Sequence, residues 1–355
     1  MAESTAAGAS GASPAENSPY LDGLETTEEE QRELGDSAKR RLTQKDKRQL
    51  AVLGAMDAAV FLFIMVYLWV SGTDPFARVR RNAAFDPSVD YYNVASAFEA
   101  AEPNLRQTDY PEGMLPEFRA LYSQNNDTVG WLRIEGTGID GPVVQAADND
   151  TYLRRDFYRE PDQRTRLYFA DFRNTFGAAA DAFSKVTIVY GHHLTEDNRI
   201  FAEVENYLDV DYYRARPLIE FDTIYGRTVW KVFACFITAV DDAAETVFYY
   251  WDTDVPDDRT AAFCSEILTR SWFINPAVDI AVTDKLLCLS TCTYMIKDDR
   301  ENRCVLMARM VRPGEKETVD TAAAYENVNR RMPHAWYVQE GLPDPYVRMP
   351  VYGAG

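Results

Sequence analysis

Histidine and cysteine are scarce in this sequence. Three His and five Cys occur among 355 residues, so chemistry that depends on histidine has few candidates. Five Cys are too few for a disulfide scaffold of this length, and an odd number leaves one thiol unpaired unless it bonds another molecule. Basic residues are outnumbered, with 37 Lys and Arg against 56 Asp and Glu and a formal net charge of −19. This balance argues against a nucleic-acid-binding protein, which needs clustered Lys and Arg to displace counterions.

Signatures of bound metals and cofactors are also missing. The three His, two of them adjacent, and the dispersed Cys do not match the ligand spacing of a zinc site. The sequence contains no Gly-rich phosphate loop and no internal repeat. We therefore predict no metal and no cofactor. The hydrophobic fraction of 46 % is nevertheless sufficient for a packed core, which excludes a wholly disordered chain.

One long hydrophobic run occurs near the N-terminus. Residues 50–70 (LAVLGAMDAAVFLFIMVYLWV) are apolar except for Asp57 and are long enough to cross a membrane as a helix. Six Lys and Arg lie between positions 39 and 48, whereas the next basic residue after the run is Arg78. By the positive-inside rule, the N-terminus is expected in the cytosol and the rest of the chain outside. A cleaved signal peptide fits less well, because its apolar region spans only roughly 7–15 residues.

Composition divides the chain into five parts. Residues 1–49 combine an acidic tail, expected to be disordered in the cytosol, with the basic juxtamembrane segment. The predicted single-pass transmembrane helix covers 50–71, and 72–112 are interrupted by prolines and form a predicted extracellular linker. Residues 113–312 form the predicted folded domain. Residues 313–355 are a polar C-terminal extension to which the sequence assigns no role.

The folded domain consists mainly of short hydrophobic runs of strand length, separated by Gly, Asp and Asn. Helices are expected at about 114–123, 200–208 and 257–270. Strands are predicted at 129–134, 142–145, 166–170, 185–190, 217–222, 227–239, 285–291 and 303–311. Many short strands with few helices favour a mainly-β fold, a closed or nearly closed barrel of about eight strands with flanking helices.

Three chemically active residues lie at the ends of separate predicted strands. The run KLLCLSTCTY places Cys292 at a strand end, KVTIVYGHHL places His192 there, and NRCVLMARMV opens on Arg303. Taken singly, each has a plainer interpretation: a buried thiol, an exposed histidine and a solvated strand-end charge. Together they suit thiol catalysis, because a neighbouring imidazolium promotes the thiolate and a guanidinium can stabilise an oxyanion. They converge only if the strands are neighbours, which the sequence alone does not establish.

These runs resemble the three signature segments of sortases, and of class B sortases in particular. The segments NNDTVGWLRIEGTGIDGPVVQAADNDTYLRRDFY at 125–158 and TRLYFADFRN at 165–174 extend the resemblance, which covers about 114–312. The predicted helix at 257–270 resembles the helical insert that separates class B from class A. Under the resemblance, 113–312 is a sortase catalytic domain with a closed sortase-type β-barrel, held on the outer face of a Gram-positive cell membrane. A papain-like protease and an L,D-transpeptidase fit less well, because their Cys environments differ.

The resemblance implies a cysteine transpeptidase that anchors surface proteins to the cell wall or polymerises pili. Cys292 would attack the Thr carbonyl of an Asn-Pro-x-Thr-x-like sorting motif in a secreted protein. An amine of a peptidoglycan precursor or of a pilin Lys would resolve the thioacyl-enzyme. His192 would transfer protons, Arg303 would stabilise the oxyanion, and Ser290 and Thr291 would line the substrate groove. The alternative is a catalytically degenerate, membrane-tethered module that binds pilins or surface proteins.

Three positions depart from the family pattern. Sortases usually have Asn directly after the catalytic His, whereas a second His follows here, and His192 is favoured because YGH is the matching segment. Arg300 also lies at an acceptable spacing from the nucleophile, but Arg303 opens the apolar strand. Cys304 stands where the family tends to have a bulky apolar residue, and is either a core thiol or a partner for Cys288.

Overall fold

The structure is a computed structural model, and it describes residues 110–177, 182–194, 199–240, 247–297 and 301–347. The chain separates into two compact units at residue 84, and every described residue belongs to the second. The predicted cytosolic tail, the predicted transmembrane helix at 50–71 and nearly all of the predicted linker lie outside the described residues. Within the described part, no helix combines the length and apolar character needed to span a membrane.

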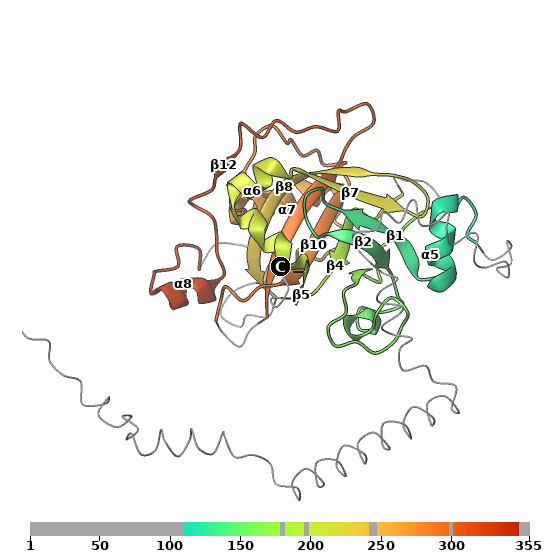
Figure 1. Ribbon diagram of the computed structural model, residues 1–355. Coiled ribbons are helices and arrows are strands. Elements are labelled where there is room, and N and C mark those ends of the chain that lie inside the picture. The colour runs from blue at the N-terminus through green and yellow to red at the C-terminus, as the bar shows by residue number, and fades with distance from the viewer. Residues whose placement is uncertain (1–109, 178–181, 195–198, 241–246, 298–300, 348–355) are drawn as a thin grey trace, which may run out of the picture. The chain divides into compact units, whose positions relative to one another are not determined.

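Eight strands close into a barrel in the order β1-β2-β3-β4-β10-β11-β8-β7 (Figure 1). Their bounds are β1 Thr128–Arg133, β2 Asp140–Val144, β3 Tyr168–Ala170, β4 Val186–Tyr190, β7 Leu218–Thr223, β8 Val229–Ala239, β10 Leu286–Cys292 and β11 Asn302–Met310. Strand β1 pairs with both β2 and β7 and so closes the barrel. The predicted barrel and its eight strands are confirmed, and their ends differ from the prediction by no more than two residues.

Short helices and two small β-ladders surround the barrel. They are η1 Pro116–Phe118, α5 Arg119–Gln124, η2 Thr151–Arg154, β5 His193–Leu194, β6 Arg199–Ile200, η3 Phe201–Leu208, α6 Val210–Ala215, α7 Asp257–Arg270, β9 Phe273–Ile274, β12 Tyr325–Glu326 and α8 His334–Glu340. The helix predicted at 257–270 is confirmed as α7. The one predicted at 200–208 is a 3₁₀ helix, and the one at 114–123 is split between η1 and α5.

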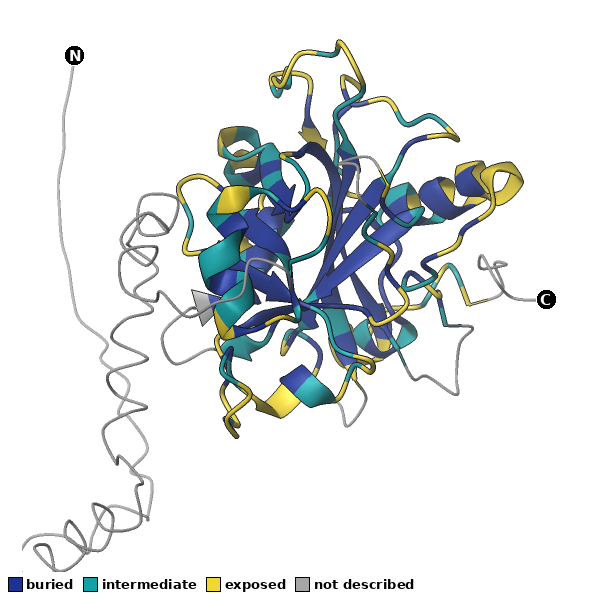
Figure 2. Ribbon diagram, turned by 90° about the vertical axis from the view of Figure 1, so that its right-hand side faces the viewer, coloured by how far each residue is buried: buried dark blue, intermediate teal, exposed yellow. Residues whose placement is uncertain are grey.

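Strand β8 shows why the sequences of the central strands are almost continuously apolar. All eleven of its residues are buried. Figure 2 shows the long central strands mostly in dark blue, the colour of buried residues. Trp230 and Cys235 pack into the barrel interior, whereas Phe233 and Phe236 pack on the outer side with Phe263 of α7. Successive side chains of a strand point to opposite faces, so burial of both faces requires apolar residues at every position.

The same alternation overturns one proposed role of Cys304. Cys304 faces the barrel interior, where its sulfur lies 3.7 Å from that of Cys235. Cys288 lies in the cluster on the outer side, and its register partner on β11 is Met307. Cys304 and Cys288 therefore point to opposite faces and cannot pair, and both are free thiols.

The C-terminal extension is folded against the barrel through a buried charge cluster. Arg309 of β11 is only 1 % exposed, and each of its terminal nitrogens donates a 2.7 Å hydrogen bond to Glu315. Lys231 of β8 donates a further bond of 2.6 Å to the same carboxylate. The hydrogen bonds from Arg309, reinforced by Lys231, hold the pKa of Glu315 far below its usual range. The extension thus begins with an ion pair that the barrel needs for charge balance.

Replacing Glu315 by glutamine is expected to lower the free energy of unfolding by about 3 kcal/mol, because Arg309 is left buried without its main counter-charge. Asp279 still lies 3.3 Å from Arg309, which keeps the loss near the lower end of the range for broken buried pairs. Urea denaturation of the two proteins at pH 7 measures the difference. Glu317→Gln is the matched control, because Glu317 is 53 % exposed and pairs with Arg227 only at 3.6 Å.

The same variant should respond differently to acid. Folding lowers the pKa of Glu315, so its stabilisation is complete above the unfolded pKa of about 4.3 and is lost as pH falls from there toward the lower folded value. The wild-type free energy of unfolding should therefore fall more steeply below pH 4.3 than that of Glu315→Gln. Parallel slopes for the two proteins would contradict this assignment.

Candidate active site

Strand pairing brings the three predicted catalytic residues to one end of the barrel. Strand β10 runs antiparallel to β11, and its register places Cys292 directly opposite Arg303. Strand β10 also runs parallel to β4, with Ser290 opposite Tyr190. Parallel strands end at the same edge of a sheet, so His192, two residues beyond β4, lies at the edge where β10 ends at Cys292. The convergence that the sequence could not establish is thus present.

Arg303 is held in a partly buried position beside the nucleophile. Its side chain is 22 % exposed and donates a 2.6 Å hydrogen bond to Glu301. Burial acts to lower the pKa of Arg303, but the nearby Cys292, Tyr250 and Glu301 together outweigh it and raise that pKa. A charged guanidinium therefore stands next to the thiol. The alternative candidate, Arg300, lies outside the described residues.

The two predicted groove residues are buried in this structure. The Ser290 hydroxyl lies 2.8 Å from the Tyr250 hydroxyl, on the outer side of the barrel. Thr291 is the next residue along β10, and its buried hydroxyl has no hydrogen-bond partner among the described residues. Because side chains alternate along a strand, Cys292 points to the same side as Ser290 and Tyr250. Their role as substrate contacts stays a prediction.

The two adjacent histidines have different partners. His192 Nε2 lies 2.8 Å from the Leu153 carbonyl oxygen of η2, whereas His193 Nδ1 lies 2.8 Å from the carbonyl oxygen of Cys292 itself. A carbonyl can only accept a hydrogen bond, so each of these nitrogens carries the proton. Nδ1 of His192 therefore remains available for proton transfer. Nδ1 of His193, in contrast, donates to the backbone carbonyl of the nucleophile.

Glu205 of η3 connects His193 to the strand end. One carboxylate oxygen accepts a 2.6 Å hydrogen bond from the Thr293 hydroxyl, and the other lies 3.5 Å from His193 Nδ1. The Tyr294 ring packs edge-on against the His193 ring, with centroids 5.3 Å apart. Sequence analysis missed this cluster, because no motif marks Glu205. The second histidine of the GHH segment was the available clue.

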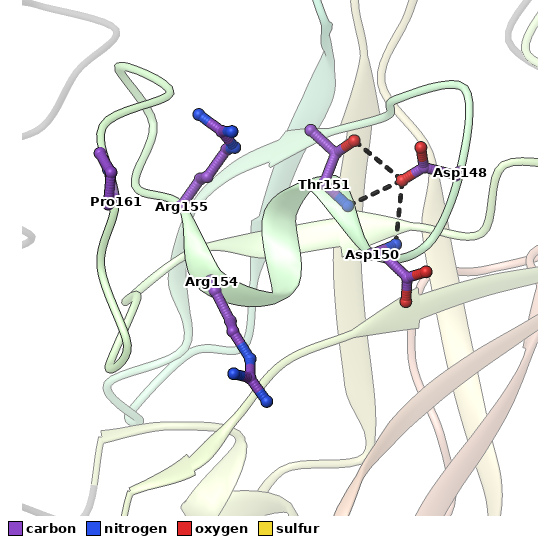
Figure 3. A pocket seen from close by; sticks show the side chains of 6 residues that line it. All are labelled: Asp148, Asp150, Thr151, Arg154, Arg155 and Pro161. Atoms are coloured by element: carbon purple, nitrogen blue, oxygen red, sulfur yellow. Dashed lines mark hydrogen bonds between the residues drawn. The ribbon is translucent and has the colours of Figure 1, made fainter.

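A surface hollow of about 320 Å³ lies on the turn that His192 contacts. Figure 3 shows Arg154 and Arg155 pointing in different directions from η2, while Asp148 accepts hydrogen bonds from Asp150 and Thr151. The lining residues are Asp148, Asp150, Thr151, Arg154, Arg155 and Pro161. None of the predicted catalytic residues lines this hollow, but His192 contacts Leu153, which lies between the lining residues Thr151 and Arg154 on η2.

Thiol labelling should distinguish Cys292 from the other cysteines. Cys292 is partly exposed, and the other four Cys are buried. Burial raises the pKa of Cys264 to about 12 and also raises that of Cys288, which suppresses their reactive thiolates. We expect one thiol per chain to react rapidly with a maleimide in the native protein and five after unfolding. Rapid labelling of Cys264 or Cys288, located by peptide mapping, would contradict this expectation.

Among the described residues, no group of three or more His, Cys, Asp and Glu is arranged to hold a metal ion. The groups that strand pairing brings to this end of the barrel are a thiol, an imidazole and a guanidinium. A hydroxyl pair, Ser290 and Tyr250, lies beside them on the same face.

Comparison with known proteins shows which family shares this arrangement. No family model matches the chain. A curated sortase B from Staphylococcus aureus is 33 % identical over 208 residues, which are 59 % of this chain and 80 % of that relative. A curated sortase B from Listeria monocytogenes is 29 % identical over 262 residues, or 74 % of this chain and 94 % of the relative.

Solved structures agree with the sequence relatives. A Staphylococcus aureus sortase B–substrate complex superposes with a TM-score of 0.51 at 30 % identity, covering 67 % of this chain and 99 % of that one. A 2.0 Å crystal structure of Staphylococcus aureus sortase B has a TM-score of 0.50 at 31 % identity and covers 62 % of this chain and 97 % of that one.

Proposed function

This chain belongs to the class B sortases, which are cysteine transpeptidases, and from that premise we propose a specific reaction for it. The enzyme cleaves an Asn-Pro-x-Thr-x-like motif near the C-terminus of a secreted protein, after the Thr. It then joins the new Thr carbonyl to an amine, either of a peptidoglycan precursor or of a pilin Lys.

The reaction proceeds through two acyl transfers. The Cys292 thiolate attacks the Thr carbonyl carbon and forms a tetrahedral oxyanion, which Arg303 stabilises. The C–N bond then breaks, and the leaving amine takes a proton from His192, which leaves a thioester on Cys292. The acceptor amine attacks that thioester and gives a proton to His192, and the sulfur leaves as the thiolate. The imidazolium and the thiolate are thus restored for the next turnover.

The pairing of Cys292 with Arg303 across β10 and β11 is the observation that supports this proposal most strongly. Residues directly opposite on antiparallel strands have Cβ atoms about 4.5–5.5 Å apart, within reach of a long guanidinium side chain. This reach supports the proposed role of Arg303, in which its positive charge stabilises the negative charge that develops on the substrate.

The proposal also places the enzyme in the cell membrane. The apolar run at 50–71, preceded by clustered basic residues, is proposed to be a single-pass anchor with the N-terminus inside. The catalytic domain then lies outside the cell, where secreted proteins and cell-wall precursors are accessible.

Intact-mass spectrometry tests the proposed reaction. The full chain is purified in detergent and incubated with Asn-Pro-x-Thr-x and Leu-Pro-x-Thr-Gly peptides, with and without a small amine acceptor. We expect a covalent adduct of the mass of the peptide up to its Thr, formed with the Asn-Pro-x-Thr-x class and removed by the amine. If folded protein with a reduced Cys292 forms no adduct with any peptide, the alternative of a catalytically degenerate, partner-binding module is favoured instead.

A further inference from the structure

The C-terminal extension reaches the loop that follows the nucleophile. This loop begins at Thr293, whose backbone N–H donates a 3.1 Å hydrogen bond to the Asn302 carbonyl oxygen, and it returns to β11 near Arg303. We propose that the extension, through Gln339 of α8, positions this loop and thereby the catalytic end of β10. This inference rests on the proposed transpeptidation and assigns Gln339 as a positioning residue.

Gln339 holds the loop backbone with both ends of its amide. Its Oε1 accepts a 2.8 Å hydrogen bond from the Lys297 N–H, and its Nε2 donates one of 3.2 Å to the Met295 carbonyl oxygen. One side chain thus satisfies two backbone groups on either side of Ile296, as a neighbouring strand would. Because Gln339 itself is exposed, replacing it leaves no cavity in the core.

Apolar contacts fix the same loop. Ile296 is buried in a cluster with Met332, Ala335 and Tyr337 of the extension, and Met295 packs against that cluster. Ile237 of β8 belongs to it as well, so α8, the loop and the barrel wall share one small core. The loop therefore rests on the extension through both its side chains and its backbone.

The extension is itself anchored at a distance from the loop. The Asn327 backbone N–H donates a 2.8 Å hydrogen bond to the carbonyl oxygen of Trp272, just after α7, and the Arg331 backbone N–H donates one of 2.9 Å to the Thr269 carbonyl oxygen. His334, the first residue of α8, pairs at 2.9 Å with Asp344, which follows the helix. Figure 1 shows the extension passing from β12 to α8 along this route. The segment before α8 is thus fixed to the end of α7, and the pair of His334 with Asp344 ties the residues after α8 back to its first turn.

The position of this loop matters because it carries groups that touch the candidate active site. Tyr294, 62 % exposed, packs on His193, and Thr293 is bonded to Glu205, which lies beside His193. His193 in turn contacts the Cys292 carbonyl oxygen. A displacement of the loop is thus transmitted to the backbone of the nucleophile, where an error of about 1 Å can lower a rate up to 10²-fold.

Gln339→Ala in the full chain tests the proposal, with Val338→Ala as the matched control on the same helix, where Val338 is 65 % exposed. We expect Gln339→Ala to lower kcat for thioester formation about tenfold, with KM for the peptide changed less than about twofold. Gln339→Glu keeps the acceptor for Lys297 but loses the donor to Met295, so its kcat should be intermediate. Val338→Ala should match the wild type.

Hydrogen exchange provides a readout that needs no substrate. The amides of residues 293–297 should exchange faster in Gln339→Ala than in the wild type or Val338→Ala, with the barrel strands and the Tm unchanged. Unchanged exchange together with wild-type kcat would overturn the proposal, as would a general loss of protection across the barrel. If the wild type forms no adduct, the proposed function fails, whereas the exchange comparison still decides whether Gln339 holds the loop.

Discussion

Cys292→Ala is expected to lower transpeptidation at least about 10⁴-fold, because the variant has no nucleophile with which to form the thioester. The other groups at this end of the barrel cannot replace the thiol. The Ser290 hydroxyl is hydrogen-bonded to the Tyr250 hydroxyl at 2.8 Å. Cys288, which precedes Ser290 by two residues on β10, is fully buried. Product formation from a fluorescent sorting peptide and an amine acceptor, followed by chromatography, measures the loss.

Binding should survive this substitution, which separates loss of chemistry from loss of recognition. Removing one sulfur from a partly exposed strand end leaves the barrel core intact, so the peptide Kd should stay within about threefold of the wild type. Cys264→Ala is the matched control, because it makes the same chemical change in α7 and should keep its activity. Turnover by Cys292→Ala within tenfold of the wild type would assign the nucleophile to another residue.

His192→Ala is expected to lower kcat about 10³-fold, within the range for loss of a general acid–base group. The His192 ring is held through Nε2 on the Leu153 carbonyl oxygen, which leaves Nδ1 available to exchange a proton with the substrate amines. Steady-state kinetics with the peptide and a saturating amine measure the effect. Added imidazole should restore part of the lost rate if the missing group is the proton donor and acceptor.

His193→Asn is the matched control for this assignment. His193 donates from Nδ1 to the Cys292 carbonyl oxygen, and an asparagine amide can also donate to a carbonyl. We therefore expect kcat to fall by less than about tenfold, because the substitution keeps a donor to the Cys292 backbone and does not remove the proton-transfer group. A larger loss in His193→Asn than in His192→Ala, with rescue by imidazole only in the former, would reverse the two roles.

The barrel was predictable because the strand signals are strong and local. Strand β8 is apolar at all but two of its positions, since both its faces are covered, and the β10 run LLCLSTC changes to small polar residues where the strand reaches the barrel end. Turn residues separate these runs, so their boundaries were accurate to two residues. A helix is also present where one was predicted at 200–208, and its 3₁₀ geometry was not part of that prediction.

The supports of the site were not predictable in the same way. Glu205 lies 88 residues from Thr293 in sequence, and Gln339 lies 42 residues from Lys297, yet each pair is joined by a hydrogen bond. Neither residue belongs to a motif, and neither strand nor helix periodicity marks it. The same holds for Glu315 and its partner Lys231, which are 84 residues apart.

The sequence by itself determined the strand positions, the three candidate catalytic residues and the resemblance to class B sortases. These rest on local patterns of apolar and small residues, which are visible along the chain. Only the tertiary structure decided that Cys292 faces Arg303, that Cys304 meets Cys235 and not Cys288, and that the C-terminal extension supports the loop after the nucleophile. The physical reason is that closure of the barrel sets the strand order, the register and the face to which each side chain points. Closure brings together segments that are far apart in the sequence, and the local sequence of each segment does not specify its partner.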